Sequence, residues 1–339
     1  MRARVGINGL GRIGRGVLRA IVERGEKAFD VVAVNDVAPV GTLAHLLRYD
    51  STYGPWPHQV EVAGDYLAID EHSIRIQHEP DPALLGWARL DVDVVIEATG
   101  RFRTGERAGA HLAAGAQKVV ITAPATDVDL TVVMGVNDDR YDAATHHVIS
   151  NASCTTNCAA PMAQVLHQGF GIVEALLTTV HGYTPDQNLL DGPHKDPRRA
   201  RAAAINIIPT STGAARAVGR VLPELAGRLD GVALRVPVVD GSLVDLTARL
   251  AEPASVGQVN RAFTSAEDGP LKGILRCTSD PVVSRDVIGE NASCLFDLGL
   301  TQVTGDLVKV FGWYDNEWGY AQRTLDLVEL ITHTLPPAP

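Results

Sequence analysis

Cysteine is scarce in this sequence, which has only four in 339 residues: Cys154, Cys158, Cys277 and Cys294. Four cysteines are too few for the disulfide framework of a secreted scaffold, and no cluster of cysteine and histidine completes a zinc ligand set. We therefore expect free thiols and no metal site. These cysteines are then of interest for the reactivity of their thiols rather than as structural cross-links.

Long apolar runs and an excess of positive charge are also missing. No stretch approaches the roughly 18 to 20 apolar residues that a membrane span requires, and the first residues lack the pattern of a secretory signal. Lysine and arginine number 30 against 40 acidic residues, a formal net charge of -10, which disfavours a general affinity for nucleic acid. We expect a soluble, cytoplasmic protein with no membrane or nucleic-acid partner.

The composition that remains is that of a folded protein. Hydrophobic residues make up 45% and charged residues 21%, which makes disordered and low-complexity classes a poor fit. A chain of this length exceeds the usual size of a single core, so we expect two domains.

A glycine-rich turn joins the first strand and the first helix that the sequence predicts. Residues 4–8 have the pattern of a short buried strand, and residues 12–24 carry apolar residues at helical spacing. Between them, Gly9, Gly11 and Gly14 form the pattern G-x-G-x-x-G. The first glycine permits a tight turn, the second lets backbone approach a pyrophosphate, and the third lets the helix pack on the strand.

The residues around this turn predict a dinucleotide site. Backbone N–H groups at the helix start, near Arg12 and Ile13, would hold the phosphates. A second strand, residues 31–34, ends in Asn35 and Asp36, about 20 residues beyond the glycines, where a ribose-binding acid belongs. A 2'-phosphate would meet a like charge at Asp36, so the sequence favours NAD over NADP. The alternative is a plain loop with a turn aspartate.

The strand and helix pattern continues as in a doubly wound sheet. A strand at 92–97, a helix near 105–114 and a strand at 118–122 indicate parallel strands joined by helices. Thr99, Gly100 and Thr122 follow strand ends, where such a sheet lines its ligand crevice. Each of them also fits a simple turn.

Cys154 stands at the predicted start of a helix. The small polar run 150–158 precedes an apolar helical pattern at 159–167. The helix dipole and the N–H groups there favour the thiolate, the reactive form. Cys158, four residues on, would share a helix face with Cys154. The alternatives for such a cysteine are a metal site, a disulfide or an inert buried thiol; we expect Cys158, Cys277 and Cys294 to be inert.

His181 follows an apolar strand pattern at 175–180 and is a candidate base. Its imidazolium would stabilise the Cys154 thiolate, and it would take a proton from a tetrahedral intermediate. Taken singly, any of the eleven histidines is more often structural. Beyond it, basic residues in 196–201 and hydroxyls in 210–214 suit oxyanions, or else form a solvated basic turn and a helix cap.

Six segments together resemble the phosphorylating glyceraldehyde-3-phosphate dehydrogenase family, in order over almost the whole chain: INGLGRIGR, SNASCTTNC, HGYTPDQ, LLDGPHKDPRRARAAAINIIPTSTGAA, ALRVP and WYDNEWGY. By that resemblance Cys154 is the nucleophile and His181 its base. The implied site for inorganic phosphate comprises Ser153, Thr155, Arg199, Thr212 and Gly213. Thr184, Asp186 and Arg235 match the site for the substrate phosphate and cofactor ribose, Asn316 matches the residue that holds the nicotinamide carboxamide, and Tyr320 lies beside it.

The resemblance also implies a fold and a reaction. The fold is α/β: a Rossmann-like doubly wound parallel sheet domain at 1–153, completed by a C-terminal helix at 317–339, and an α+β catalytic domain at 154–316 with a mixed, largely antiparallel sheet. The implied reaction oxidises glyceraldehyde 3-phosphate with NAD through a cysteine thioester, which inorganic phosphate attacks to give 1,3-bisphosphoglycerate. A homotetramer is the family's usual assembly.

Some positions depart from the family pattern. Glu79-Pro80-Asp81-Pro82 lacks an arginine usual near the adenine, and Gly182, Pro185 and the loop 238–242 differ near the active cleft. These changes suggest a duplicated copy tolerant of a cysteine-directed inhibitor as one alternative. By the same resemblance, Pro193 also favours NAD over NADP, as Asp36 does. Erythrose-4-phosphate dehydrogenase is the other alternative, although its relatives usually lack the segments seen here at 193–196 and 212–215.

Overall fold

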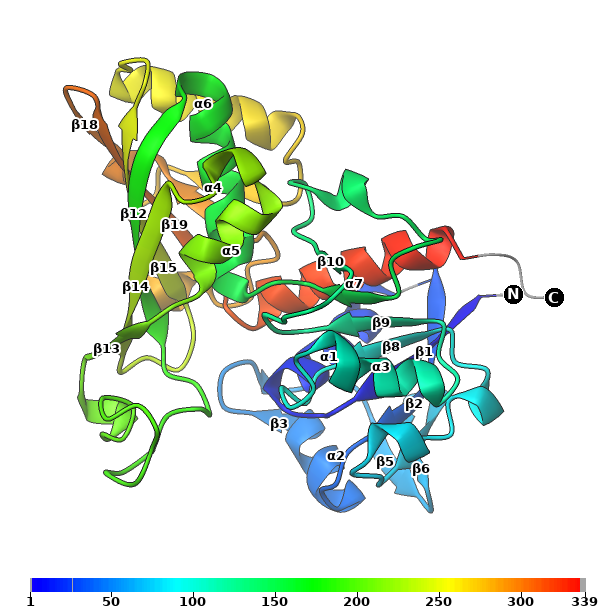
Figure 1. Cartoon of the computed structure of the whole chain (residues 1–339). Helices are drawn as coiled ribbons and strands as arrows, with labels where there is room; N and C mark the ends of the chain where they lie inside the picture. Colours follow the sequence, from blue (N-terminus) through cyan, green and yellow to red (C-terminus); the bar gives the residue numbers. More distant parts are fainter. Residues whose placement is uncertain (1, 26, 336–339) are drawn as a thin grey trace. The chain divides into compact units, whose positions relative to one another are not determined.

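The computed structural model describes residues 2–25 and 27–335 and divides the chain into two compact units (Figure 1). The first unit comprises the chain up to Val132, Asp138–Ala152 and the segment from Ala321 onward. The second comprises Val133–Asn137 and Ser153–Tyr320. Each unit has its own sheet and is described by itself.

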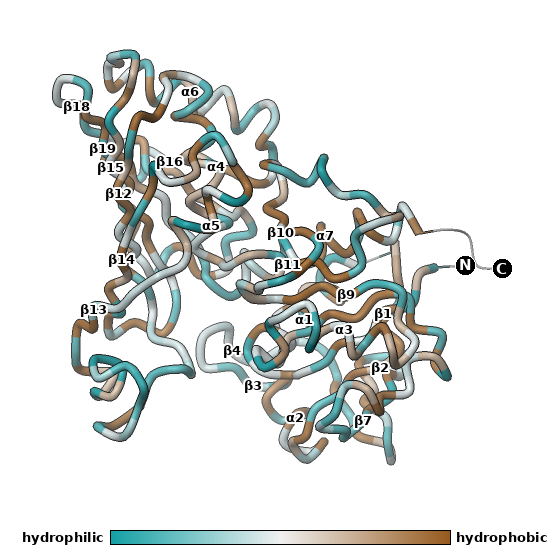
Figure 2. Tube along the Cα trace, in the orientation of Figure 1, coloured by the Kyte–Doolittle hydropathy of each residue, from teal (hydrophilic) through white to brown (hydrophobic). Residues whose placement is uncertain are grey.

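The first unit is built on a nine-stranded sheet in the order β10-β11-β9-β8-β1-β2-β7-β6-β5. Pairing is parallel from β10 to β7 and antiparallel at the β7-β6-β5 edge. The strands are β1 Ala3–Asn8, β2 Phe29–Asn35, β5 Val60–Ala63, β6 Tyr66–Ile69, β7 His72–Gln77, β8 Val94–Glu97, β9 Lys118–Ile121, β10 Leu130–Thr131 and β11 Val148–Ser150, with a separate pair β3 Tyr49–Asp50 and β4 Gly54–Pro55. Every residue of β8 and β9 is buried, as in a parallel sheet covered on both faces, and Figure 2 shows the hydrophobic residues along these central strands.

Helices α1 Arg12–Arg24, α2 Val40–Arg48 and α3 Gly105–Ala113 connect these strands. Helix α1 ends because Gly25 adopts the left-handed conformation, from which its N–H reaches the carbonyls of Ile21 and Val22. At α3, the Thr104 side chain accepts the Arg107 N–H and so caps the helix start. The doubly wound α/β class predicted from the sequence is confirmed, and the predicted strands and helices agree with the observed ones to within a few residues.

The second unit has an eight-stranded mixed sheet, ordered β13-β14-β12-β15-β19-β17-β16, with β18 paired to β19. Only β12 with β14 and β16 with β17 pair in parallel, so the predicted largely antiparallel sheet is confirmed. The strands are β12 Ile172–Gly182, β13 Ile208–Ser211, β14 Leu229–Val236, β15 Ser242–Leu250, β16 Leu275–Thr278, β17 Cys294–Asp297, β18 Gln302–Thr304 and β19 Leu307–Tyr314.

Three helices, α4 Cys154–Phe170, α5 Ala214–Val221 and α6 Val256–Asp268, cover one face of this sheet (Figure 1). Eleven residues of α4 are buried, because it packs on four strands and lies against both α5 and α6. Short 3-10 turns occupy Pro82–Leu84, Ala88–Leu90, Asp138–Arg140, Ala203–Ile205, Pro223–Leu225, Ser284–Val287 and Leu298–Leu300.

The C-terminal helix α7 runs over Trp318–His333, inside the predicted extent of 317–339. The part of that prediction that falls on residues 336–339 lies outside the described part of the chain. From Ala321 onward α7 belongs to the first unit, where Asn151 donates to Thr324 (3.1 Å) and Arg24 pairs with Asp326 (2.6 Å). Within the described ranges, we find no helix with the length and apolarity for crossing a bilayer.

Candidate active site

The glycine turn between β1 and α1 leaves the backbone at the start of α1 uncovered by side chains. Gly9 has φ +96°, a conformation that only glycine adopts without strain. A Cβ at Gly14 would lie 1.9 Å from the Gly9 carbonyl oxygen, so the turn excludes a side chain there. The space around Gly11 is open to 4 Å, and α1 begins at the next residue, so the positive end of its dipole faces an accessible backbone.

Beside this turn, a pocket lies over the ends of β1, β2 and β8 and is lined by Asn8, Gly9, Gly11, Asn35, Asp36, Val37, Glu79, Pro80, Ala98, Thr99, Arg101 and Phe102. The Asp36 carboxylate accepts the N–H groups of Leu10 (2.7 Å) and Ala38 (2.9 Å), which fix its orientation and leave lone pairs for ribose hydroxyls. A helix start, an open glycine backbone and a fixed carboxylate fit a dinucleotide with an unphosphorylated ribose.

Five predicted cofactor residues of the first unit do not line this pocket: Arg12, Ile13, Gly14, Gly100 and Thr122. The Arg12 guanidinium pairs with Asp50, and the Thr122 hydroxyl donates to the Glu97 carbonyl (3.1 Å). Conversely, Asn8, Arg101 and Phe102 line the pocket and were missed. Their position at or just after a strand end is the signal that would have found them.

In the second unit, Cys154 and His181 lie side by side. Ser153 caps α4 by accepting the Thr156 N–H (3.0 Å), so Cys154 is the first helical residue, as predicted. His181 is the penultimate residue of β12 and is buried, and its Nε2 lies 3.4 Å from the Cys154 Sγ. Its Nδ1 lies 2.7 Å from the Gly182 carbonyl, which requires a proton on Nδ1. Nε2 is then an acceptor facing the thiol.

Burial opposes a charge on either member of this pair. Burial raises the pKa of Cys154 to about 11, although Arg235 and the N–H and hydroxyl of Thr155 act in the opposite direction. Burial, with a further contribution from Arg235, lowers the pKa of His181 to about 3. The helix start therefore acts in the predicted direction, but desolvation outweighs it. The thiolate–imidazolium state of the pair stays a prediction.

Tyr314 is a buried residue of this site that the sequence did not single out. Its hydroxyl contacts those of Thr155 (2.9 Å) and Thr179 (2.8 Å), and its ring lies edge-on to His181. The Thr155 side chain is thus turned into the protein, so its assignment to a phosphate site stays a prediction. Tyr314 lies in the WYDNEWGY segment, which was noted only for its overall likeness to the family.

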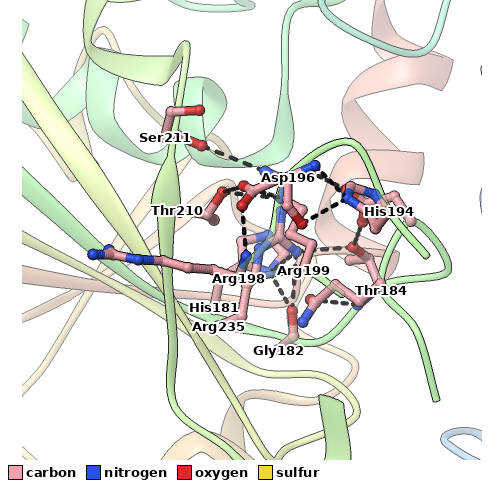
Figure 3. A network of polar contacts seen from close by, with 12 residues as sticks. His181, Gly182, Thr184, His194, Asp196, Arg198, Arg199, Thr210, Ser211 and Arg235 are labelled. Atoms are coloured by element: carbon pink, nitrogen blue, oxygen red, sulfur yellow. Dashed lines mark hydrogen bonds and ion pairs between the residues drawn. The ribbon is translucent and has the colours of Figure 1, made fainter. Parts of the chain in front are cut away.

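Four of the predicted anion-binding residues form one polar network with His181 (Figure 3). Arg235 Nη1 lies 3.1 Å from His181 Nδ1 and donates to the Thr184 hydroxyl (3.0 Å). Thr184 donates to Asp186, which pairs with Arg199, and Arg199 in turn donates to Thr210 (2.9 Å). The network joins Arg235 and Arg199 to the histidine through Thr184 and Asp186, and guanidinium groups suit oxyanions.

The other predicted anion residues lie at helix starts. Ser153 caps α4, and the Thr212 hydroxyl accepts the Ala214 N–H (3.1 Å) at the start of α5, whose N-cap is Gly213. Their role in phosphate binding stays a prediction.

Asn316 and Tyr320 are buried residues of the second unit, near the junction of β19 and α7. The Asn316 Oδ1 accepts a hydrogen bond from Ser242 (2.5 Å), whose oxygen also accepts the Gly182 N–H (3.2 Å). A Cβ at Gly182 would lie 3.0 Å from the Val238 carbonyl oxygen. The glycine and the loop 238–242, both departures from the family pattern, are therefore in direct contact.

The remaining cysteines offer no second reactive centre. All four cysteines are free; Cys158 and Cys294 are buried, and burial raises the pKa of Cys158 and Cys277. Over residues 2–25 and 27–335 no group of three or more His, Cys, Asp or Glu side chains is placed to hold a metal ion.

The parallel sheet with its glycine turn fits an NAD-dependent oxidoreductase, and the thiol beside a histidine is a candidate reactive cysteine. Two family models match the chain: glyceraldehyde 3-phosphate dehydrogenase, NAD binding domain, at residues 3–105, and glyceraldehyde 3-phosphate dehydrogenase, C-terminal domain, at residues 153–316. The chain belongs to the glyceraldehyde 3-phosphate dehydrogenase family.

Curated relatives match this chain over almost its full length. The glyceraldehyde-3-phosphate dehydrogenase of Mycobacterium avium is 55% identical over 340 residues, covering 99% of this chain and 100% of the relative. That of Streptomyces coelicolor is 55% identical over 337 residues, and glyceraldehyde-3-phosphate dehydrogenase 2 of Streptomyces arenae is 54% identical over 335, both with the same coverage.

Proposed function

We propose that this chain oxidises glyceraldehyde 3-phosphate, with NAD and inorganic phosphate, to 1,3-bisphosphoglycerate. The observation that carries the proposal is the Cys154–His181 pair, 3.4 Å apart, beside a network containing Arg235, Thr184 and Arg199. A nucleophile, a base and cationic donors for phosphate are what this reaction requires. The family names of full-length relatives support the same substrate.

The first step uses the Cys154–His181 pair. As the Cys154 sulfur adds to the aldehyde carbon, His181 Nε2 takes the thiol proton and returns it to the new oxyanion, which gives a hemithioacetal and leaves His181 neutral. Arg235 and the Thr184 hydroxyl bind the substrate phosphate, and Asp186 holds both Arg199 and Thr184 in place.

The second half of the reaction forms and cleaves a thioester. His181 then accepts the hydroxyl proton of the hemithioacetal as the hydride leaves the same carbon. The glycine turn and Asp36 would hold NAD, Asn316 would hold its carboxamide, and the cofactor would supply the hydride acceptor. Inorganic phosphate, bound by Arg199 with Ser153, Thr155, Thr212 and Gly213, then attacks the thioester carbonyl, and Cys154 leaves as the thiolate. The acyl phosphate keeps the free energy that hydrolysis would release.

The test measures NADH formation from glyceraldehyde 3-phosphate with and without inorganic phosphate, in wild type and Cys154→Ser. We expect phosphate-dependent turnover that falls by at least about a thousandfold in the variant, because a serine hydroxyl is a far weaker nucleophile than a thiol. Erythrose 4-phosphate serves as the competing substrate. Turnover that persists in Cys154→Ser, or that favours erythrose 4-phosphate, would contradict the proposal.

We also propose a homotetramer located in the cytoplasm, with residues 1–153 and the C-terminal segment binding NAD and residues 154–316 carrying the chemistry. Two groups of exposed apolar side chains in the second unit support the assembly. The first group is Leu176 and Val232, on the sheet face that the helices do not cover. The second group is Leu189, Leu190, Ile205 and Ile207, and each of these four side chains is at least 67% exposed. Two separate apolar surfaces allow two isologous interfaces, as a tetramer requires. Four free thiols fit a reducing compartment.

A further inference from the structure

A buried carboxylate lies beneath the dinucleotide pocket and has no role in the reaction described above. Glu97, the last residue of β8, is 1% exposed. Its Oε2 accepts from Asn8 Nδ2 (2.6 Å) and His111 Nε2 (3.0 Å), and its Oε1 accepts from the Thr99 N–H (2.8 Å) and hydroxyl. A carboxylate has four lone-pair positions, and all four are occupied.

The hydrogen bonds of His111 identify its tautomer. The Trp87 indole N–H has only donor character and lies 3.0 Å from His111 Nδ1, so Nδ1 is the acceptor. The ring proton is therefore on Nε2 and points at Glu97. Both His111 and Trp87 are fully buried, so the ring is held in one orientation by partners at both nitrogens.

The contacts continue from Glu97 to the pocket wall. Asn8 Nδ2 is committed to Glu97, so its Oδ1 faces Asn35, which donates to it (2.7 Å). Asn35 holds the backbone of Glu79 through the Glu79 N–H and carbonyl, both at 2.9 Å. Asn8, Asn35, Glu79 and Thr99 all line the pocket. One buried carboxylate thus orients pocket residues from the ends of β1, β2 and β8.

We propose that Glu97 and His111 are positioning residues for the dinucleotide, holding Asn8, Asn35 and Thr99 in the arrangement that binds it. The proposal relies on the NAD site of this chain but not on its aldehyde substrate. Removal of the His111 N–H leaves a buried carboxylate oxygen without one donor, and Glu97 then rotates or draws in water, which releases Asn8 and Thr99. The expected result is weaker NAD binding with little change in kcat.

The test compares His111→Leu with His111→Gln by calorimetric titration with NAD and with ADP-ribose, which needs no catalysis. Leucine removes both hydrogen bonds, and we expect Kd for both ligands to rise about tenfold, the effect of one lost hydrogen bond. Glutamine has an acceptor for Trp87 and a donor for Glu97, so its Kd should stay within about twofold of wild type. In steady-state assays, KM for NAD should rise in His111→Leu while kcat is retained.

Trp56→Phe is the matched control, because it removes a different tryptophan hydrogen bond in the same unit, from Trp56 to the Glu23 carboxylate (3.0 Å), away from the pocket. It should lower the melting temperature and leave both Kd values unchanged. A folded His111→Leu with wild-type Kd, or a control that weakens binding equally, would overturn the proposal. Should His111→Leu not fold, Glu97→Gln gives the same comparison, since its amide faces existing donors, and an unchanged Kd there overturns the proposal too.

The two proposals fail separately. If NAD binds and responds to these substitutions while glyceraldehyde 3-phosphate is not oxidised, the positioning role stands and the proposed substrate is wrong. If glyceraldehyde 3-phosphate is oxidised but Kd for NAD does not change in these variants, the proposed substrate stands and the positioning role is wrong.

Discussion

Arg235 influences both partners of the catalytic pair. Its guanidinium lies 3.1 Å from His181 Nδ1, and its positive charge lowers the pKa of both Cys154 and His181. Burial raises the pKa of Cys154 and lowers that of His181. The same arginine therefore favours the thiolate and disfavours the imidazolium, so it prepares the nucleophile and keeps the base able to accept a proton.

Replacement of this charge should be visible in the reactivity of the thiol. In Arg235→Gln we expect the pKa of Cys154 to rise, because the charge that opposes burial is gone. Alkylation of Cys154 by iodoacetamide, followed by mass spectrometry over pH 6 to 10, should be severalfold slower at each pH. Arg249→Gln, which removes an exposed pair with Glu174, is the control. An alkylation profile that is unchanged or moves to lower pH would refute this role.

At the scale of elements, helix α4 packs closely on β17 and β19 at one glycine. A Cβ at Gly312 on β19 would lie 2.6 Å from both the Cys294 and Met162 sulfur atoms and 3.1 Å from that of Cys158. The contact brings α4, and with it Cys154 at its start, against the sheet. Close packing of this kind leaves no room for one additional methyl group.

Gly312→Ala should therefore destabilise the protein by about 1–3 kcal/mol through overpacking. Gly109→Ala in α3 is the matched control, because nothing lies within 4 Å of its Cβ position. That change should stabilise by about 0.5–1 kcal/mol, since alanine loses less backbone entropy in a helix. Denaturant unfolding of the two variants measures both effects. Equal changes in the free energy of unfolding of the two variants would show that the contact of Gly312 with the sulfur atoms does not limit the packing.

At the scale of the whole molecule, two buried carboxyls link folding to pH. Asp240 and Asp315 are each no more than 2% exposed and are hydrogen-bonded to one another, which requires a shared proton. Burial, with the nearby charges of Asp315 and Glu317, raises the pKa of Asp240 to about 9. The folded protein thus binds a proton that the unfolded chain releases above its ordinary aspartate pKa.

Because the folded state holds the extra proton, the contribution of Asp240 to the free energy of unfolding should fall as pH rises from about 4 to about 9. Asp240→Asn has no proton to lose, so its stability should decline less over that range and should exceed that of wild type most at pH 8 to 9. Denaturant unfolding at pH 5, 7 and 9 measures the difference. Asp230→Asn, at an exposed position, should follow wild type. Parallel pH curves for Asp240→Asn and wild type would refute the shared proton.

Assembly is the other property of the whole molecule. Leu176 is 69% exposed and Val232 50% exposed on the sheet face of the second unit that the helices do not cover. Leu176→Glu would place a charge in an interface there, so light scattering after gel filtration should show a smaller species than wild type. Leu84→Glu, at a leucine 67% exposed in the first unit, is the control. A wild-type mass for Leu176→Glu would exclude this face as an interface.

Local rules of sequence determined most of the framework. The spacing of Gly9, Gly11 and Gly14 predicted the turn, and the apolar periodicity around them predicted β1 and α1. Cys154 was placed at a helix start because small polar residues precede an apolar helical pattern, and His181 at a strand end for a similar reason. These features follow from neighbours within about four residues, where backbone sterics and periodicity decide the structure.

Only the tertiary structure decided which distant groups meet and what charge they carry. Thr155 and Tyr314, Ser242 and Asn316, and Glu97 and His111 are pairs joined by folding, and the spacing of residues in the sequence predicts none of them. The pKa shifts of Cys154 and His181 have the same origin. A helix start favours a thiolate locally, but desolvation depends on every element that packs over the site, and it exists only once the chain has folded.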